Sequence, residues 1–102
     1  MDIESIKRTL ATFSEKRNWD QYHSPKNLAM ALSVEVSELL EIFQWLTEEQ
    51  SKNLSNEQMQ HAEEEIADIA IYVLNLCRKL DIDLEKAILN KIESNAIKYP
   101  VK

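Results

Sequence analysis

The sequence predicts an all-α fold, and three observations support that prediction. The chain has no glycine and only two prolines, Pro25 and Pro100, so it lacks the residues that tight β-turns prefer. It is rich in Leu, Ile, Ala, Glu and Lys, which form helices or pack well in helical cores. Apolar residues recur at helical spacing along most of the 102 residues. No change in composition marks a boundary, so we expect a single domain over residues 1–102.

The first two helices are expected on either side of a loop rich in aromatic and amide side chains. Apolar residues at helical spacing predict a helix over residues 2–17. After the loop at residues 18–24, Ser24 and Pro25 are typical of a helix N-cap and a first helical position. The second helix is therefore expected over residues 25–46.

The remaining two helices are also predicted by their caps. Ser55, with Gln58 three residues later, is typical of a capping box and predicts a helix over residues 56–80. Asp83 is a suitable N-cap for a last helix. That helix should end before Pro100, because proline disfavours helical backbone in the residue preceding it. A four-helix bundle follows.

Self-association is expected from the lengths of the second and third helices. They would be roughly 33 and 38 Å long at 1.5 Å per residue, and a chain this short cannot cover their apolar faces. We therefore expect homo-oligomerisation to complete the bundle. Closed twofold symmetry makes a dimer, or a tetramer built as a dimer of dimers, the first expectation.

Charge and cysteine content exclude several classes of partner. The net charge of −6 argues against binding to a nucleic acid polymer, which requires many Lys and Arg. Cys77 is the single cysteine, and no apolar run approaches the ~20 residues of a membrane span. The N-terminus shows no signal peptide pattern. We expect a soluble, cytoplasmic protein that does not bind membranes.

Four carboxylates interrupt apolar stretches of the second and third helices. Glu35 and Glu38 are three positions apart, as are Glu65 and Asp68, so each pair projects from one helical face. If the helices form an antiparallel hairpin, the pairs lie about 14 and 17 Å from the connector and are nearly level. Four facing carboxylates repel one another unless a cation intervenes. An all-oxygen site of this kind favours Mg²⁺.

Two alternatives to this metal site remain open from spacing alone. A chain with many glutamates produces E-x-x-E spacings by chance on solvated faces, although two level pairs within apolar stretches weigh against chance. A carboxylate-bridged di-iron protein would need the Glu-x-x-His motif. Neither His23 nor His61 follows a glutamate by three positions, so that class is disfavoured.

The sequence around these acids resembles a known family. SVEVSELLEIFQW at 33–45 and EEIADIAIYVLNL at 64–76 are similar to the E-x-x-E and E-x-x-D halves of the MazG-like all-α nucleotide pyrophosphohydrolases, and particularly of their dCTP-hydrolysing branch. RNWDQYHSPKNL at 17–28 extends the resemblance. A K-x-x-x-N-x-x-K-Y-P pattern at 91–100 completes it, so that it covers nearly the whole chain with matching spacing.

The resemblance implies a Mg²⁺-dependent hydrolase that converts a nucleoside triphosphate to the monophosphate and pyrophosphate. Mn²⁺ could replace Mg²⁺. Glu35, Glu38, Glu65 and Asp68 would be the metal ligands, and Glu38 the general base. dCTP is the first expected substrate, with dATP or a wider set as alternatives, and the activity would remove unwanted nucleotides. The competing hypotheses are an enzyme for another phosphoanhydride and a non-catalytic acidic helical interaction module.

Nucleotide recognition is assigned to two further groups of residues. Aromatic faces stack on bases, and imidazole groups read their edges. The expected base-binding residues are Trp19, His23, Trp45 and Tyr72. The resemblance assigns the triphosphate to one polar face of the last helix, at Lys91, Asn95 and Lys98. Each of these residues could instead be an ordinary core aromatic or part of a solvated stripe.

Overall fold

The computed structural model describes residues 1–102 and confirms the all-α prediction. The elements are α1 (Ile3–Lys16), the 3₁₀ helix η1 (Asp20–Tyr22), α2 (Pro25–Phe43), α3 (Glu48–Ser51), α4 (Asn56–Leu80) and α5 (Leu84–Lys98). None of the helices combines the length and the apolarity that a membrane span requires.

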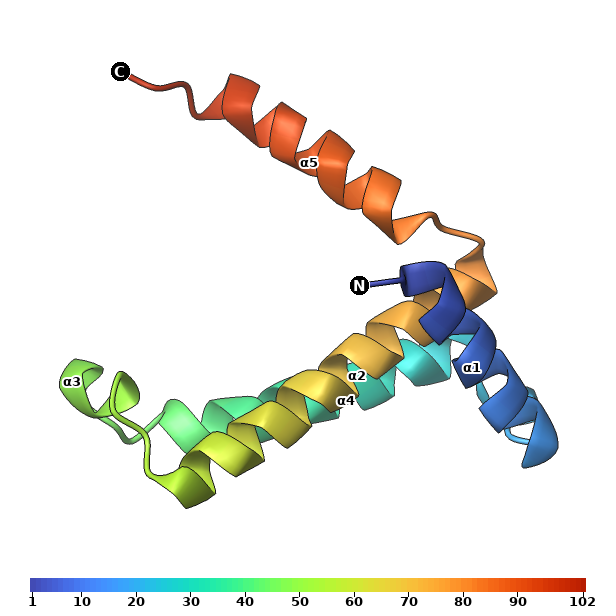
Figure 1. Cartoon of the computed structure of the whole chain (residues 1–102), viewed down its shortest axis with the longest axis horizontal. Helices are drawn as coiled ribbons and strands as arrows, with labels where there is room; N and C mark the ends of the chain where they lie inside the picture. Colours follow the sequence, from blue (N-terminus) through green and yellow to red (C-terminus); the bar gives the residue numbers. More distant parts are fainter.

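The centre of the fold is an antiparallel hairpin of α2 and α4, which lie side by side along most of their lengths (Figure 1). α1 packs against α4 near the end of the hairpin where α4 finishes (Figure 1). The buried apolar side chains of this small core are Leu28 on α2 and Ala62, Leu74 and Cys77 on α4. The predicted hairpin therefore forms, and it brings the two acidic pairs onto facing surfaces.

Side-chain caps place the helix boundaries where the sequence predicted them. Ser24 and Asp83 each accept a backbone N–H from three residues further on, both at 3.1 Å. Ser55 and Gln58 form a reciprocal capping box, with distances of 3.1 and 2.9 Å. These bonds satisfy amide groups that the first helical turn leaves unpaired. Consequently α4 has the predicted bounds, and α5 ends before Pro100 as expected.

Two local predictions need correction. α2 ends at Phe43 and not at Leu46, because Thr47 adopts an extended conformation and caps a new helix. That helix, α3, was not predicted. Its capping box pairs Thr47 with Gln50 through bonds of 3.1 and 2.9 Å, the same signal that marked α4. The loop before α2 also contains the unpredicted η1.

The turn after α4 requires left-handed backbone in a chain without glycine. Asp81 ends α4 with φ 57°, and its backbone N–H donates to the carbonyl of Cys77. Asn18, after α1, has φ 55°. Asn and Asp are the non-glycine residues that tolerate this region best, so the two positions carry suitable side chains.

α5 stands apart from the hairpin, so one chain alone does not close the predicted four-helix bundle (Figure 1). Its apolar side chains, among them Leu89 and Ile92, are exposed to 59% each. The radius of gyration is 16.6 Å, compared with about 13 Å for a compact domain of this length. The accessible surface is 8140 Å², compared with about 5,900 Å² for a typical folded monomer of this mass.

Candidate functional site

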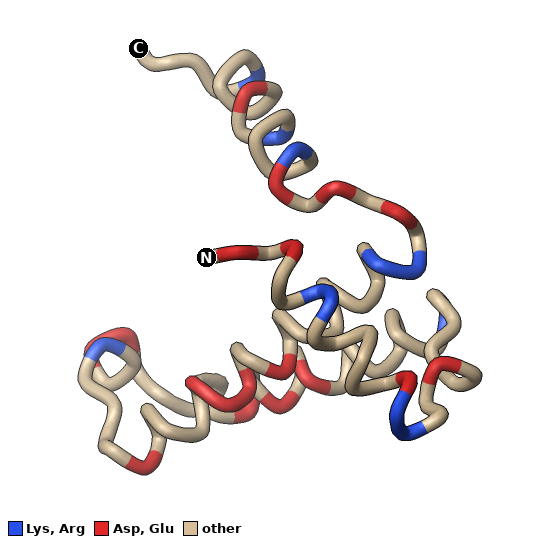
Figure 2. Tube along the Cα trace, turned by 45° about the vertical axis from the view of Figure 1, so that its right-hand side comes forward, with Lys and Arg blue, Asp and Glu red and all other residues tan.

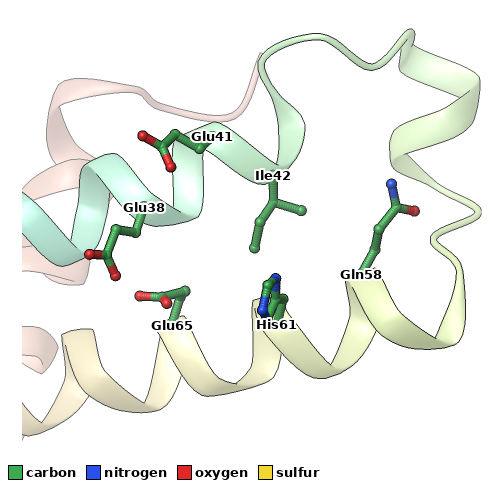
Figure 3. A pocket seen from close by; sticks show the side chains of 6 residues that line it. All are labelled: Glu38, Glu41, Ile42, Gln58, His61 and Glu65. Atoms are coloured by element: carbon green, nitrogen blue, oxygen red, sulfur yellow. The ribbon is translucent and has the colours of Figure 1, made fainter.

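Three of the four predicted metal ligands form one cluster between α2 and α4. Ligand oxygens of Glu35, Glu38 and Glu65 all lie within 4.8 Å of one another. In Figure 3, Glu38 on α2 and Glu65 on α4 point toward each other across the hairpin, and Glu41 lies about one turn further along α2 beside the same cavity. The spacing of three residues in α2 and the antiparallel pairing with α4 therefore produce the expected meeting of carboxylates.

The cluster has no compensating positive charge. Glu35 Oε2 and Glu65 Oε2 are buried and have no hydrogen-bond partner. No Lys or Arg lies between Lys26 and Lys52, nor between Lys52 and Arg78. In Figure 2 the middle of the hairpin accordingly shows red segments without blue ones. Buried carboxylate oxygens that lack both a donor and a cation are unfavourable, and such oxygens are typical ligands of a hard cation.

The crowding of carboxylates raises the pKa of two members of the cluster. The hydrogen bond with Glu65, burial and the charge of Glu38 raise the pKa of Glu35 to about 7. The same hydrogen bond lowers the pKa of Glu65, but burial and the neighbouring Glu38 and Asp68 outweigh it, so that the pKa of Glu65 is also raised. An all-oxygen donor set of this charge fits a hard divalent cation.

Asp68, the fourth predicted ligand, lies outside the three-residue cluster. Its charge nevertheless contributes to raising the pKa of both Glu35 and Glu65, so it is part of the same electrostatic environment. Asp68 and Glu35 also line a cavity of about 260 Å³ between α1, the following loop, α2 and α4. Asp68 therefore lines this cavity and acts electrostatically on the acid cluster.

Three of the four predicted base-binding residues line the same cavity: Trp19, His23 and Tyr72. The rings of Trp19 and His23 are 6.4 Å apart at 63°, and Trp19 also meets Phe13 edge-on at 5.5 Å. These edge contacts hold the indole of Trp19, which is still 43% exposed. The cavity thus joins aromatic side chains to the acid cluster, and we call it the aromatic cavity.

His23 is held as a neutral ring in this cavity. Its Nδ1 lies 3.4 Å from the hydroxyl of Ser14, which is buried. Burial and then the charge of Arg78 lower the pKa of His23 below its ordinary value. At neutral pH the ring therefore offers one N–H donor and one acceptor nitrogen.

Asn75 is a cavity residue that sequence reasoning missed. It follows Tyr72 by three positions, lines the aromatic cavity and is only 4% exposed. Its Oδ1 accepts hydrogen bonds from Nε and Nη2 of Arg78, at 3.4 and 3.3 Å. The available signal was a polar residue within an apolar stretch, seven positions after Asp68 and thus on the same helical face.

A second, more polar cavity of about 460 Å³ opens on the other side of the cluster (Figure 3). Glu38 and Glu65 line it together with His61, Gln58 and the aliphatic side chain of Ile42. The acid cluster is consequently accessible from two sides, one aromatic and one polar.

Four other predicted residues lie away from this site within one chain. Trp45 is 85% exposed, because α2 ends before it and its helical face no longer continues. Lys91, Asn95 and Lys98 are on α5, which extends away from the hairpin, and all three are exposed. None of the four lines either cavity.

The chain is similar to known proteins along most of its length. Residues 30–102 match the model of the MazG-like family. dCTP pyrophosphatase 1 from Bos taurus is 40% identical over 101 residues, which are 97% of this chain and 60% of that protein. The Homo sapiens dCTP pyrophosphatase 1 is 38% identical over 100 residues, which are 96% of this chain and 59% of that protein. The chain thus matches about 60% of the length of these curated relatives.

The fold has a close counterpart among solved structures. The crystal structure of a pyrophosphatase from Archaeoglobus fulgidus aligns with a TM-score of 0.92 and 41% sequence identity. The alignment covers 99% of this chain and 94% of the other. Together with the family match over residues 30–102, this likeness confirms the resemblance that the acidic motifs indicated, and the chain belongs to the MazG-like family.

Proposed function

We propose that this protein is a divalent-cation-dependent pyrophosphohydrolase that converts a nucleoside triphosphate, with dCTP as the first candidate, to the monophosphate and pyrophosphate. The main support for this proposal is the position of the acid cluster next to the aromatic cavity. The acid cluster and the aromatic cavity share Glu35 and adjoin at Asp68, so a metal-binding surface and a base-sized aromatic pocket are continuous. A nucleotide requires both features, side by side.

The acid cluster would hold the metal. Glu35, Glu38 and Glu65 supply carboxylate oxygens, and Asp68 lies at the border toward the aromatic cavity. Mg²⁺ fits this donor set, and Mn²⁺ could replace it. When bound, the ion neutralises charge on phosphoryl oxygens and favours attack at phosphorus.

Glu38 is the residue we assign as general base. Unlike Glu35 and Glu65 it is exposed, and it borders the polar cavity, from which a water can reach the cluster. Its carboxylate would accept one proton from the attacking water. The water oxygen then bonds to phosphorus, the bridging oxygen between the α- and β-phosphates leaves, and nucleoside monophosphate and pyrophosphate separate.

The aromatic cavity would hold the base. Trp19 and Tyr72 offer aromatic faces and edges, and neutral His23 offers a ring nitrogen for hydrogen bonding. The likeness to proteins named dCTP pyrophosphatase supports dCTP as the first substrate to test. dATP or a wider set of deoxynucleotides are the alternatives.

We further propose that the working form is a homo-oligomer, a dimer or a dimer of dimers. The chain exposes roughly 2,000 Å² more surface than a typical monomer of its mass, an area suited to an obligate interface. The exposed apolar residues of α5 are part of that surface. A second copy packed against α5 would also bring an acid cluster and its nucleotide close to Lys91, Asn95 and Lys98. In their own chain these three residues line neither cavity.

The direct test is a pyrophosphate-release screen. The full chain would be incubated with each of the four dNTPs and Mg²⁺, and both pyrophosphate and orthophosphate would be measured. We expect pyrophosphate as the primary product, with dCTP cleaved fastest, and loss of turnover in excess chelator. Orthophosphate as the primary product, or activity that survives the chelator, would contradict the proposal.

The second candidate function is a non-catalytic helical interaction module. The exposed apolar side chains of α5 favour it, because they need a partner of some kind. This alternative predicts no turnover of any dNTP and no gain in melting temperature with Mg²⁺. The pyrophosphate-release screen and thermal melting with and without Mg²⁺ therefore distinguish the enzyme from the interaction module.

A further inference from the structure

The buried amide of Asn75 lies at the far end of the aromatic cavity from the acids. Asp68, Tyr72 and Asn75 occupy one face of α4, at intervals of four and three residues. Asp68 and Asn75 are therefore about 10 Å apart along the helix axis, at 1.5 Å per residue. A nucleotide has its sugar between phosphate and base, so phosphates near Asp68 would place the base beside Asn75.

Arg78 determines which way the amide of Asn75 faces. A guanidinium group has only donors, so the atom that meets Nε and Nη2 of Arg78 at 3.4 and 3.3 Å must be the carbonyl oxygen of Asn75. Arg78 is itself held by an ion pair between Nη2 and Asp20 Oδ1, at 3.1 Å. The oxygen of the amide is consequently occupied, and its NH₂ group is the part left for a ligand.

The NH₂ group of Asn75 makes no hydrogen bond within the chain, although the residue is only 4% exposed. The fully buried side-chain atoms without a partner are oxygens of Glu35 and Glu65, so the amide nitrogen of Asn75 remains open to the cavity that it lines. The cavity wall on which it lies also carries Trp19 and Tyr72, whose stacking surfaces accept any base. The free part of this amide can only donate, as can the indole N–H of Trp19, whereas the ionised carboxylates of the cavity can only accept.

We propose that Asn75 is a specificity-determining residue whose amide N–H groups donate to the base of the bound nucleotide and select cytosine over uracil and thymine. This inference rests on the proposed function. Cytosine presents two adjacent acceptors, O2 and N3, at its pairing edge. Uracil and thymine carry a hydrogen on N3, which meets a donor-only group unfavourably. Arg78 acts as a positioning residue, because its hydrogen bonds to Oδ1 of Asn75 orient the amide group.

The test exchanges the donor for an acceptor without changing shape. In Asn75→Asp one carboxylate oxygen keeps the contact with Arg78, and the other replaces the NH₂ group. We expect the ratio of kcat/KM for dCTP to that for dUTP to fall at least tenfold, because the N3–H of uracil gains an acceptor and N3 of cytosine loses a donor. Asn75→Leu, similar in size but without polar atoms, should lower the ratio without favouring dUTP.

Two controls keep the result specific. Asn56→Asp makes the same chemical change on α4 at an exposed position outside both cavities, and it should leave the ratio unchanged. Binding is measured separately, by tryptophan fluorescence, with the non-hydrolysable α,β-imido analogues of dCTP and dUTP. The affinity ratio should shift in the same direction as the kinetic ratio. If Asn75→Asp fails to fold, the Asn75→Leu ratios decide.

The outcomes separate this inference from the proposed function. If the wild-type protein hydrolyses dNTPs but both Asn75 variants keep its dCTP to dUTP ratio, Asn75 does not read the base and the inference alone is wrong. If the wild-type protein neither hydrolyses a dNTP nor binds the imido analogues, the proposed function fails and the inference falls with it.

Discussion

Glu35 and Glu65 face each other across the α2–α4 hairpin, and each leaves one buried carboxylate oxygen without a hydrogen-bond partner. The pKa of both groups is raised, because each is buried beside other carboxylates. Their arrangement is unfavourable without a cation and suited to binding one. The energetics of this pair lead to the first two predictions.

Replacing Glu35 by Gln should not destabilise the metal-free protein at pH 8. The amide removes one of the facing charges and can donate to Glu65, so the melting temperature should stay the same or rise. The same change should remove the stabilisation that Mg²⁺ supplies by binding the folded state, which is about 2.7 kcal/mol at a hundred times Kd. Thermal melting with and without Mg²⁺ measures both effects.

Glu63→Gln is the matched control, because Glu63 is exposed on α4 and lines neither cavity. It should respond to Mg²⁺ as the wild-type protein does. A Glu35→Gln protein that melts lower without metal and still gains stability from Mg²⁺ would mean that Glu35 is a structural group and that the metal binds elsewhere.

The stability of the metal-free protein should fall as pH rises through the pKa of Glu35. The folded-state pKa of about 7 lies above the ordinary value of 4.5, so the folded chain binds this proton more tightly than the unfolded chain does. The resulting stabilisation is fully present below about pH 4.5 and is lost as pH rises through about 7. Melting temperatures from pH 5 to pH 8, in chelator, measure it.

The pKa of His23 is lowered, so this residue adds a pH dependence of the opposite sign, and the contribution of Glu35 must be measured separately. The difference in melting temperature between Glu35→Gln and the wild-type protein should increase in favour of the variant from pH 5 to pH 8. A difference that does not change with pH would show that Glu35 titrates normally.

Glu38→Gln should keep the fold and lose turnover by roughly a hundredfold or more, the usual contribution of a general base. The change preserves shape but removes the group that accepts the proton and one negative metal ligand. Pyrophosphate release from dCTP at saturating Mg²⁺ measures the loss, with Glu63→Gln again as control. Turnover within a few-fold of the wild-type rate would refute the assignment of Glu38.

Self-association should persist at micromolar concentration, because burying the exposed apolar side chains of α5 against a second chain is favourable. Light scattering should report a multiple of the 11.9 kDa chain mass. The double variant Leu89→Lys and Ile92→Lys should dissociate, since charge at a buried apolar contact is unfavourable. Ser94→Lys, on the opposite side of the same helix, should leave the mass unchanged. A wild-type monomer with full activity would overturn the proposal.

The sequence alone determined the features that depend on local chemistry. Caps at Ser24, Ser55 and Asp83 are side-chain bonds to residues three positions away, so the boundaries they mark could be predicted. The facing of Glu35 and Glu65 follows from two helical periodicities and one hairpin connection. Local signals can also be overlooked, as the capping box of α3 shows.

Only the tertiary structure decided which side chains meet across long distances in the chain. Asp20, Asn75 and Arg78 are joined by contacts that no periodicity encodes, and these contacts turn the amide of Asn75 toward the cavity. The left-handed Asp81 sends α5 away from the hairpin, so Lys91 is remote from the acids of its own chain. Helix propensity specifies a helix and its ends, whereas the direction of a helix depends on a turn and on what packs against it.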